Sequence, residues 1–186
     1  MNIYIKESEL FVFGAIKDLL SMSLYQHIYT EHVLKDEKSD GDVQVKLLYM
    51  IRAAQSDRVL VHRVAEETRP QLWYMPAPVK AKVPLYDMVL LGAKATLLEA
   101  FDVQSEHETQ IMATKSRPDT FGAFYHNDTP YILTYVFVDD KMLDEIALSD
   151  GYKVVNVTDL SKDNLNTSLD GVLLDNYIGT EEFNNE

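Results

Sequence analysis

Two short polar stretches hold the residues most able to do chemistry in this chain of 186 residues. Glu106, His107 and Glu108 are consecutive, and His126 stands two residues before Asp128. Imidazole and carboxylate groups are common ligands of catalytic divalent metals, which need about three protein ligands and an open position for water. One hypothesis is therefore a metal-dependent hydrolase that uses these histidines.

The local geometry of these residues argues against a tight metal site. In an extended segment, Glu106 and Glu108 point to the side opposite His107, so at most one side could meet His126. The same residue types are common in solvated loops. We therefore expect no tight metal site and assign no catalytic residue. If the chain is nevertheless a hydrolase that uses the 107–126 segment, the candidate catalytic residues are His107, His126 and Asp128. The remaining metal-ligand candidates are Glu106, His107, Glu108 and His126.

The sequence lacks the residues and motifs of several other common catalytic sites. The chain has no cysteine, which excludes disulfides, thiolate nucleophiles and cysteine-based metal centres. It has no glycine-rich phosphate loop, no H-E-x-x-H motif and no G-x-S-x-G motif. We expect no cofactor.

The sequence around another histidine, His62, predicts a structural role rather than catalysis. The stretches "RVLVHRVA" and "PQLWYM" flank the polar loop "EETR", which is typical of a β-hairpin. If Ala65 pairs with Pro70, His62 lies opposite Trp73, where an aromatic cross-strand contact is favourable. A catalytic or ligand role for His62 is the alternative.

The charge is strongly negative and uneven along the chain. The net charge is −13, and residues 99–150 contribute three basic and eleven acidic side chains, a net charge of −8. An acidic surface repels phosphate backbones, so we expect no direct nucleic-acid binding. A decoy of a nucleic-acid-binding protein is an alternative that the same charge allows. The sequence has no apolar run of about 18 residues and no basic start to a signal peptide, so we expect a cytoplasmic protein without membrane contact.

Hydrophobic periodicity predicts the elements that must position these residues. The pattern indicates a helix over residues 9–20 and a meander of strands from residue 24 to residue 75, with clear alternation over residues 43–51. The proline-rich stretch "PAPVKAKVP", residues 76–84, predicts a linker. A nearly all-apolar helix is expected at residues 87–102, although Gly92 costs it about 1 kcal/mol relative to alanine.

The last third alternates between strand and helix signals. "YILTYVFV", residues 131–138, is apolar on both faces, as a covered central strand would be. A short helix capped by Asp139 or Asp140, a strand "YKVVNV", a short helix "TDLSKDNL" and a last strand in "LDGVLLDN" follow.

Residues 130–177 resemble the SseB-like domain family. Tyr131–Val138 stand at that family's first strand, Asp159-Leu160 at its second helix and Asp170-Gly171 at its final strand. The resemblance implies an accessory or interaction module without settled chemistry, so no catalytic residue is carried over.

The sequence thus predicts an α+β protein with an antiparallel strand-rich N-terminal half and a compact α/β C-terminal half. Residues 1–82 are expected to form a β-meander with one N-terminal helix, and residues 83–186 the α/β half that resembles an SseB-like domain; the two halves are also compatible with a single domain. The favoured function is a non-enzymatic accessory or regulatory protein whose partner is another protein. A homo-oligomer is compatible with this hypothesis.

Overall fold

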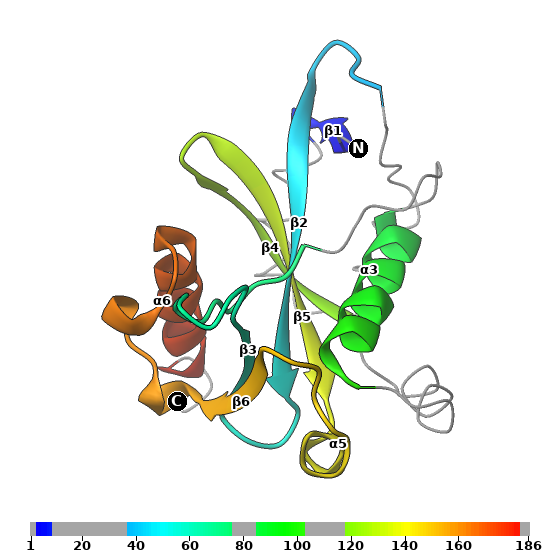
Figure 1. Ribbon diagram of the computed structural model, residues 1–186. Helices are drawn as coiled ribbons and strands as arrows, with labels where there is room; N and C mark the ends of the chain where they lie inside the picture. Colours follow the sequence, from blue (N-terminus) through cyan, green and yellow to red (C-terminus); the bar gives the residue numbers. More distant parts are fainter. Residues whose placement is uncertain (1–2, 9–36, 76–84, 103–117, 183–186) are drawn as a thin grey trace. The chain divides into compact units, whose positions relative to one another are not determined.

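A six-stranded sheet and three α-helices make up the part of the chain that the computed structural model describes, residues 3–8, 37–75, 85–102 and 118–182 (Figure 1). The strand order is β4-β5-β2-β3-β6, and β1 pairs with β2. The strands are β1 Ile3–Lys6, β2 Asp42–Ala53, β3 Arg58–His62, β4 Pro118–His126, β5 Thr129–Val138 and β6 Tyr152–Asn156. The helices are α3 Leu85–Ala100, α5 Asp140–Glu145 and α6 Ser168–Glu182, with 3-10 turns η1 Val157–Asp159 and η2 Lys162–Asn164. The fold is α+β, as the sequence predicted.

The chain divides into two compact units whose segments alternate along the sequence. Unit 1 comprises Met1–Tyr49, Tyr74–Leu97 and Lys115–Val136, and unit 2 comprises Met50–Trp73, Leu98–Thr114 and Phe137–Glu186. The expected division between residues 82 and 83 falls within residues 76–84, outside the described residues, and stays a prediction. The helix predicted at residues 9–20 and the linker lie outside them too.

In unit 1, β4 and β5 form the hairpin that the sequence did not predict. Residues 103–130 lacked a clear periodicity, yet β4 pairs antiparallel with β5 from Pro118↔Val136 to His126↔Thr129, with a register shift between Thr120 and Gly122. Asn127 and Asp128 both have positive φ, 48° and 59°, as a two-residue hairpin turn with the twist of the strands requires. Pairing with the buried β5 therefore overrides the weak strand signal of β4.

Strand β2 begins at a turn that contains Asp40-Gly41, a dipeptide that favours turns. Gly41 has a φ of 76°, and the Asp42 side chain accepts a hydrogen bond from the Ser39 backbone at 2.9 Å. β1 pairs antiparallel with the start of β2, with Ile5 opposite Val43. Further along β2, four consecutive residues, Leu48 to Ile51, are fully buried, so the alternation gives way to an apolar core segment.

Helix α3 approaches β2 closely at Gly92. A Cβ atom built on Gly92 would lie 2.9 Å from Cε2 of the buried Tyr49, and closer still to its hydroxyl group. The glycine that weakens the helix locally therefore makes room for a tyrosine ring. Burial raises the pKa of the Tyr49 hydroxyl, which stays neutral. None of the helices in the described part is long and apolar enough to cross a membrane.

In unit 2, β3 and the following chain form the predicted hairpin, but in a different register. His62 and Gln71 exchange backbone hydrogen bonds of 3.0 and 2.8 Å, so Gln71 and not Trp73 lies opposite His62. This register is two residues away from the one predicted, and it keeps each side chain on its expected face. The aromatic partner of His62 comes instead from the other neighbouring strand, β6.

The strand–helix–strand order after residue 130 is largely confirmed. β5 is buried along nearly its whole length. Asp139 caps α5 by accepting a hydrogen bond from the Lys141 backbone at 2.9 Å, as one of the two predicted caps. β6 lies where the sequence placed it, whereas "TDLSKDNL" forms the two 3-10 turns η1 and η2 in place of an α-helix.

The last predicted strand was wrong, because "LDGVLLDN" lies in helix α6. Thr167 and Asp170 form a reciprocal cap: the Asp170 carboxylate accepts from the Thr167 backbone at 2.9 Å, and the Thr167 hydroxyl lies 3.3 Å from the Asp170 nitrogen. Leu169 and Leu173 then share one buried face at helical spacing. Asp170-Gly171, which the family resemblance placed at a final strand, lies in the first turn of this helix.

Replacing Gly92 with alanine should lower the free energy of unfolding. The added methyl group must displace the Tyr49 ring, and overpacking of a core typically costs about 1–3 kcal/mol, against a helix-propensity gain of at most about 1 kcal/mol. Urea denaturation measures the difference.

Gly171→Ala is the matched control in α6, because its new Cβ would only touch the flexible Lys162 side chain at 3.5 Å. That variant should be neutral or more stable by up to about 1 kcal/mol. Equal effects of the two substitutions would contradict a steric role for Gly92.

Candidate functional site

The residues that the sequence singled out for chemistry fall in two places. Glu106, His107 and Glu108 lie outside the described residues. His126 ends β4 and Asp128 occupies the turn that follows. Within the described ranges, no group of three or more histidine, aspartate or glutamate side chains could hold a metal ion. The structure therefore brings His126 and Asp128 together only as neighbours in a hairpin.

The contacts of this hairpin are those of a turn. The His126 Nε2 atom lies 3.3 Å from the Asn127 side-chain amide, and Asp128 is exposed. Nearby, the exposed Tyr125 donates a hydrogen bond to Glu7 at 3.2 Å, which joins β4 to the chain after β1. The carboxylate and burial raise the pKa of Tyr125, with burial the larger cause.

An ion cluster joins β3 to α5 in unit 2. Arg58, the first residue of β3, contacts Asp140 at 3.0 Å and Asp144 at 2.7 Å. Ser56 also donates to the Asp140 carboxylate, and the Gln55 backbone donates to it at 2.8 Å. Burial acts to raise the pKa of Asp140, but these donors together lower it, while the two carboxylates raise the pKa of Arg58. One arginine is shared between two carboxylates, and these contacts together with the neutral donors anchor α5.

A second cluster in unit 2 consists of His62, Tyr152 and Glu99. The His62 ring stacks on Tyr152 with centroids 4.4 Å apart and planes 25° apart, and the Tyr152 hydroxyl donates to Glu99 at 3.2 Å. The sequence predicted Trp73 as the aromatic partner of His62 and missed Tyr152, because Tyr152 and Glu99 are far from His62 along the chain.

Burial governs the ionisation of this second cluster. Partial burial lowers the pKa of His62, and the nearby Glu99 carboxylate opposes that shift. Burial, followed by the charge and hydrogen bond of Glu99, raises the pKa of Tyr152. Both rings are therefore neutral at neutral pH.

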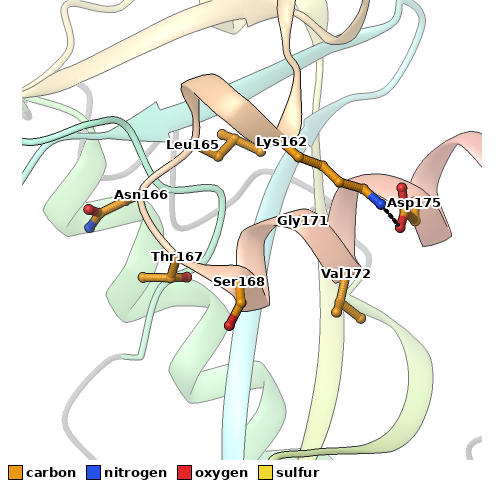
Figure 2. A pocket seen from close by; sticks show the side chains of 8 residues that line it. All are labelled: Lys162, Leu165, Asn166, Thr167, Ser168, Gly171, Val172 and Asp175. Atoms are coloured by element: carbon orange, nitrogen blue, oxygen red, sulfur yellow. Dashed lines mark ion pairs between the residues drawn. The ribbon is translucent and has the colours of Figure 1, made fainter.

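A hollow of about 380 Å³ opens beside the start of α6 (Figure 2). It is lined by Lys162, Leu165, Asn166, Thr167, Ser168, Gly171, Val172 and Asp175. Lys162 reaches across it to Asp175, and the charged atoms lie 2.6 Å apart. The Lys162 charge is thus neutralised within the hollow, whose other lining residues are the polar Asn166, Thr167 and Ser168 and the apolar Leu165, Gly171 and Val172.

The wall of the hollow is held by the buried Asp170. Its carboxylate accepts hydrogen bonds from the Leu72 backbone at 2.6 Å and from the Thr167 hydroxyl at 2.7 Å. Burial raises the pKa of Asp170, and the surrounding donors act in the opposite direction. Trp73 approaches the same Thr167 hydroxyl through its indole nitrogen at 3.4 Å. Asp170 therefore ties α6 to the hairpin that follows β3.

Comparison with known proteins finds similarity in structure alone. No protein-family model matches the sequence, and no curated protein sequence matches it. The fold is similar to that of Tm1382, a candidate Nudix hydrolase, with a TM-score of 0.51 and 11% sequence identity over 94% of this chain and 98% of that chain. At this identity the similarity shows the fold.

A second solved structure is less similar. The Ap4A hydrolase of C. elegans gives a TM-score of 0.37 at 15% identity over 73% of this chain and 95% of that chain. That score is too low to support an argument.

The likeness to Tm1382 overturns the function that the sequence favoured. The structural match covers nearly the whole of Tm1382, which is a candidate hydrolase. This finding conflicts with a non-enzymatic protein-binding module and with the interaction role that the SseB-like resemblance implied. The sequence argument failed because it inferred function from missing motifs, and a fold can carry chemistry without those motifs. The resemblance of residues 130–177 to the SseB-like family is itself untested.

Replacing Asp140 with asparagine should reduce the dependence of stability on acidic pH. The lowered pKa means that the Asp140 carboxylate stabilises the fold above its ordinary pKa of about 3.9, and that this contribution is lost as the pH falls through the lowered value. Urea midpoints measured from about pH 6 to about pH 2.5 should therefore change less in Asp140→Asn than in the unaltered protein. The exposed Asp163→Asn is the control. A slope as steep in Asp140→Asn as in the control would argue against the ion cluster.

Proposed function

We propose that this chain is a hydrolase and that its reaction uses a divalent metal ion. The observation that supports the proposal is the similarity in fold to Tm1382, which extends over 94% of this chain. This hypothesis was the alternative drawn from the sequence, and it now replaces the accessory-protein hypothesis. The expected cytoplasmic location belongs to the same proposal.

The proposed metal ligands are taken from the sequence. They are His107 and His126 with a carboxylate of Glu106 or Glu108, so this proposal replaces the expectation of no tight metal site. The part of the chain that the structure describes contains no comparable group. When bound, such an ion would polarise the scissile group and lower the pKa of a bound water.

The acidic character of this region supports cation binding over anion binding. Residues 99–150 carry a net charge of −8, which raises the local concentration of divalent cations. The same field repels anionic substrates, so a metal ion that offsets the carboxylates would also ease their approach. Charge alone does not select among ester and anhydride substrates.

A metal titration tests the proposal at its binding step. The full chain is stripped with chelator and titrated with Mg²⁺, Mn²⁺ or Zn²⁺ in a calorimeter. We expect one-to-one binding at micromolar or lower Kd, which corresponds to about 8 kcal/mol. Two variants remove proposed ligands: the double variant Glu106→Gln/Glu108→Gln and the single variant His107→Ala. Each should weaken metal binding by more than the roughly 10–100-fold that is typical when a residue supporting a ligand is lost.

An activity screen tests the chemical step. The metal-loaded chain is offered phosphate monoesters, phosphodiesters, phosphoanhydrides and carboxylic esters, and product release is compared with a metal-only blank. Turnover that chelator abolishes, and that His107→Ala reduces, is the expected result. Glu66→Gln/Glu67→Gln, which removes two exposed acids from the hairpin loop, is the charge-matched control and should retain full activity.

The two experiments separate the parts of the proposal. If turnover persists after chelator treatment, the chain is a hydrolase, but its reaction does not use a metal ion. Metal binding without turnover on any of the four bond types would contradict the hydrolase. Failure of both would overturn the proposal as a whole.

A further inference from the structure

We propose that His62, Tyr152 and Glu99 form a pH-sensitive latch, which holds the end of α3 to the β3–β6 strand pair at neutral pH and loosens in acid. We use "latch" for these three side chains only. All three belong to unit 2. The inference concerns a conformational device and is independent of the proposed hydrolase.

Tyr152 is the central side chain of the latch. It lies directly opposite His62 in the antiparallel register of β3 and β6, so the two rings are held on adjacent strands. Its ring stacks on His62 at 4.4 Å, and its hydroxyl group donates to Glu99 at 3.2 Å. One side chain thus contacts the last residue of β3 and the last turn of α3.

Backbone hydrogen bonds bring the three elements to this arrangement. Ser149 donates to the Ala100 carbonyl at 2.9 Å, and Asp102 donates to the Ala147 carbonyl at 2.9 Å, which pairs the end of α3 with the segment before β6. On the other side of that segment, Arg63 donates to the Gly151 carbonyl at 2.9 Å. The latch therefore reinforces a connection that the backbone already makes.

Gly151 is required for this close approach. Its φ of 85° lies in the left-handed region. A Cβ atom there would lie 2.8 Å from the Arg63 carbonyl oxygen and 3.6 Å from the His62 ring. The turn before Tyr152 is thus shaped by contact with the end of β3.

The charges around His62 decide the sign of its response. Glu99 from α3 and Tyr152 from β6 face it, and the neutral Gln71 pairs with its backbone. Arg63 follows it in the chain, and Lys153 follows Tyr152; both are exposed. The one nearby carboxylate favours the protonated ring, but partial burial disfavours it more, so the pKa of His62 is lowered.

A lowered pKa makes protonation favour the open form. The closed latch contributes fully above the ordinary histidine pKa of about 6.5, and its contribution is lost as the pH falls through the lowered value. A charged ring then gains hydration by leaving the stack with Tyr152. The end of α3 keeps its backbone hydrogen bonds but loses the side-chain contact that covers them.

Nuclear magnetic resonance of the full chain tests the latch directly. The His62 ring resonances should titrate with a pKa below about 6.5. Amide exchange at Asp102 and Ser149, corrected for the intrinsic rate, should accelerate between about pH 7 and about pH 5, because protonation of His62 favours the open form of the latch. The amides of Tyr49 and Tyr74, which bond each other's carbonyls in unit 1, are the internal control and should not respond.

Three variants distinguish a latch from simple packing. Tyr152→Phe keeps the stacked ring and removes the hydrogen bond to Glu99, so it should speed exchange at Asp102 at neutral pH while His62 still titrates with a lowered pKa. Glu99→Gln removes the carboxylate that favours protonation, so it should lower the pKa of His62 further. His62→Gln should leave exchange at Asp102 and Ser149 independent of pH over the same range.

Three results would overturn the latch. They are a His62 pKa at or above the ordinary value, exchange at Asp102 and Ser149 that does not change with pH, and an unchanged pH response in His62→Gln. Because these readouts need no substrate or metal, they stand whether or not the chain proves to be a hydrolase.

Discussion

The pairing of β3 on both of its edges is the constraint on which unit 2 depends. β3 is only five residues long, yet it pairs with all five residues of β6, meets β2 at Val59 and contacts Gln71 at its end. Its three central residues are buried. Edges paired in this way leave little freedom to slide, since a one-residue slip would move every side chain to the opposite face of the sheet.

The two polar clusters of unit 2 follow from that pairing. Arg58 stands at the start of β3 and anchors α5 through two carboxylates, whereas His62 stands at its end and stacks on Tyr152. A strand of fixed register therefore places one permanently charged group and one titratable group at its opposite ends. The first cluster is held by opposite charges and the second by neutral, partly buried rings, so acid affects them differently.

Asp170 has a comparable role for α6. Its carboxylate caps the helix and also accepts a hydrogen bond from the backbone of Leu72 in the hairpin. One buried group therefore determines both where α6 begins and which segment of the chain α6 packs against. The hollow beside α6 is a consequence of this arrangement. A buried carboxylate surrounded by backbone donors is costly to replace, because each donor would lose a charge-assisted partner.

The absence of common motifs favoured an accessory protein, whereas the likeness to Tm1382 shows the fold and leaves the hydrolase as our proposal. The metal-ligand candidates Glu106, His107 and Glu108 stay predictions from the sequence. His126 and Asp128 lie in the hairpin of β4 and β5.

The sequence by itself determined the elements whose signals are local. The apolar runs of β2 and β5, the Asp139 cap of α5, the Asp40-Gly41 turn and the long apolar helix α3 are all recognisable because neighbouring residues define them. Tertiary structure decided what depends on distant partners. β4 needed β5 to become a strand, "LDGVLLDN" became helix α6 with its cap bound to Leu72, and His62 found its ring partner on β6. Each of these outcomes rests on burial or hydrogen bonding between segments far apart in the chain, where periodicity carries no information.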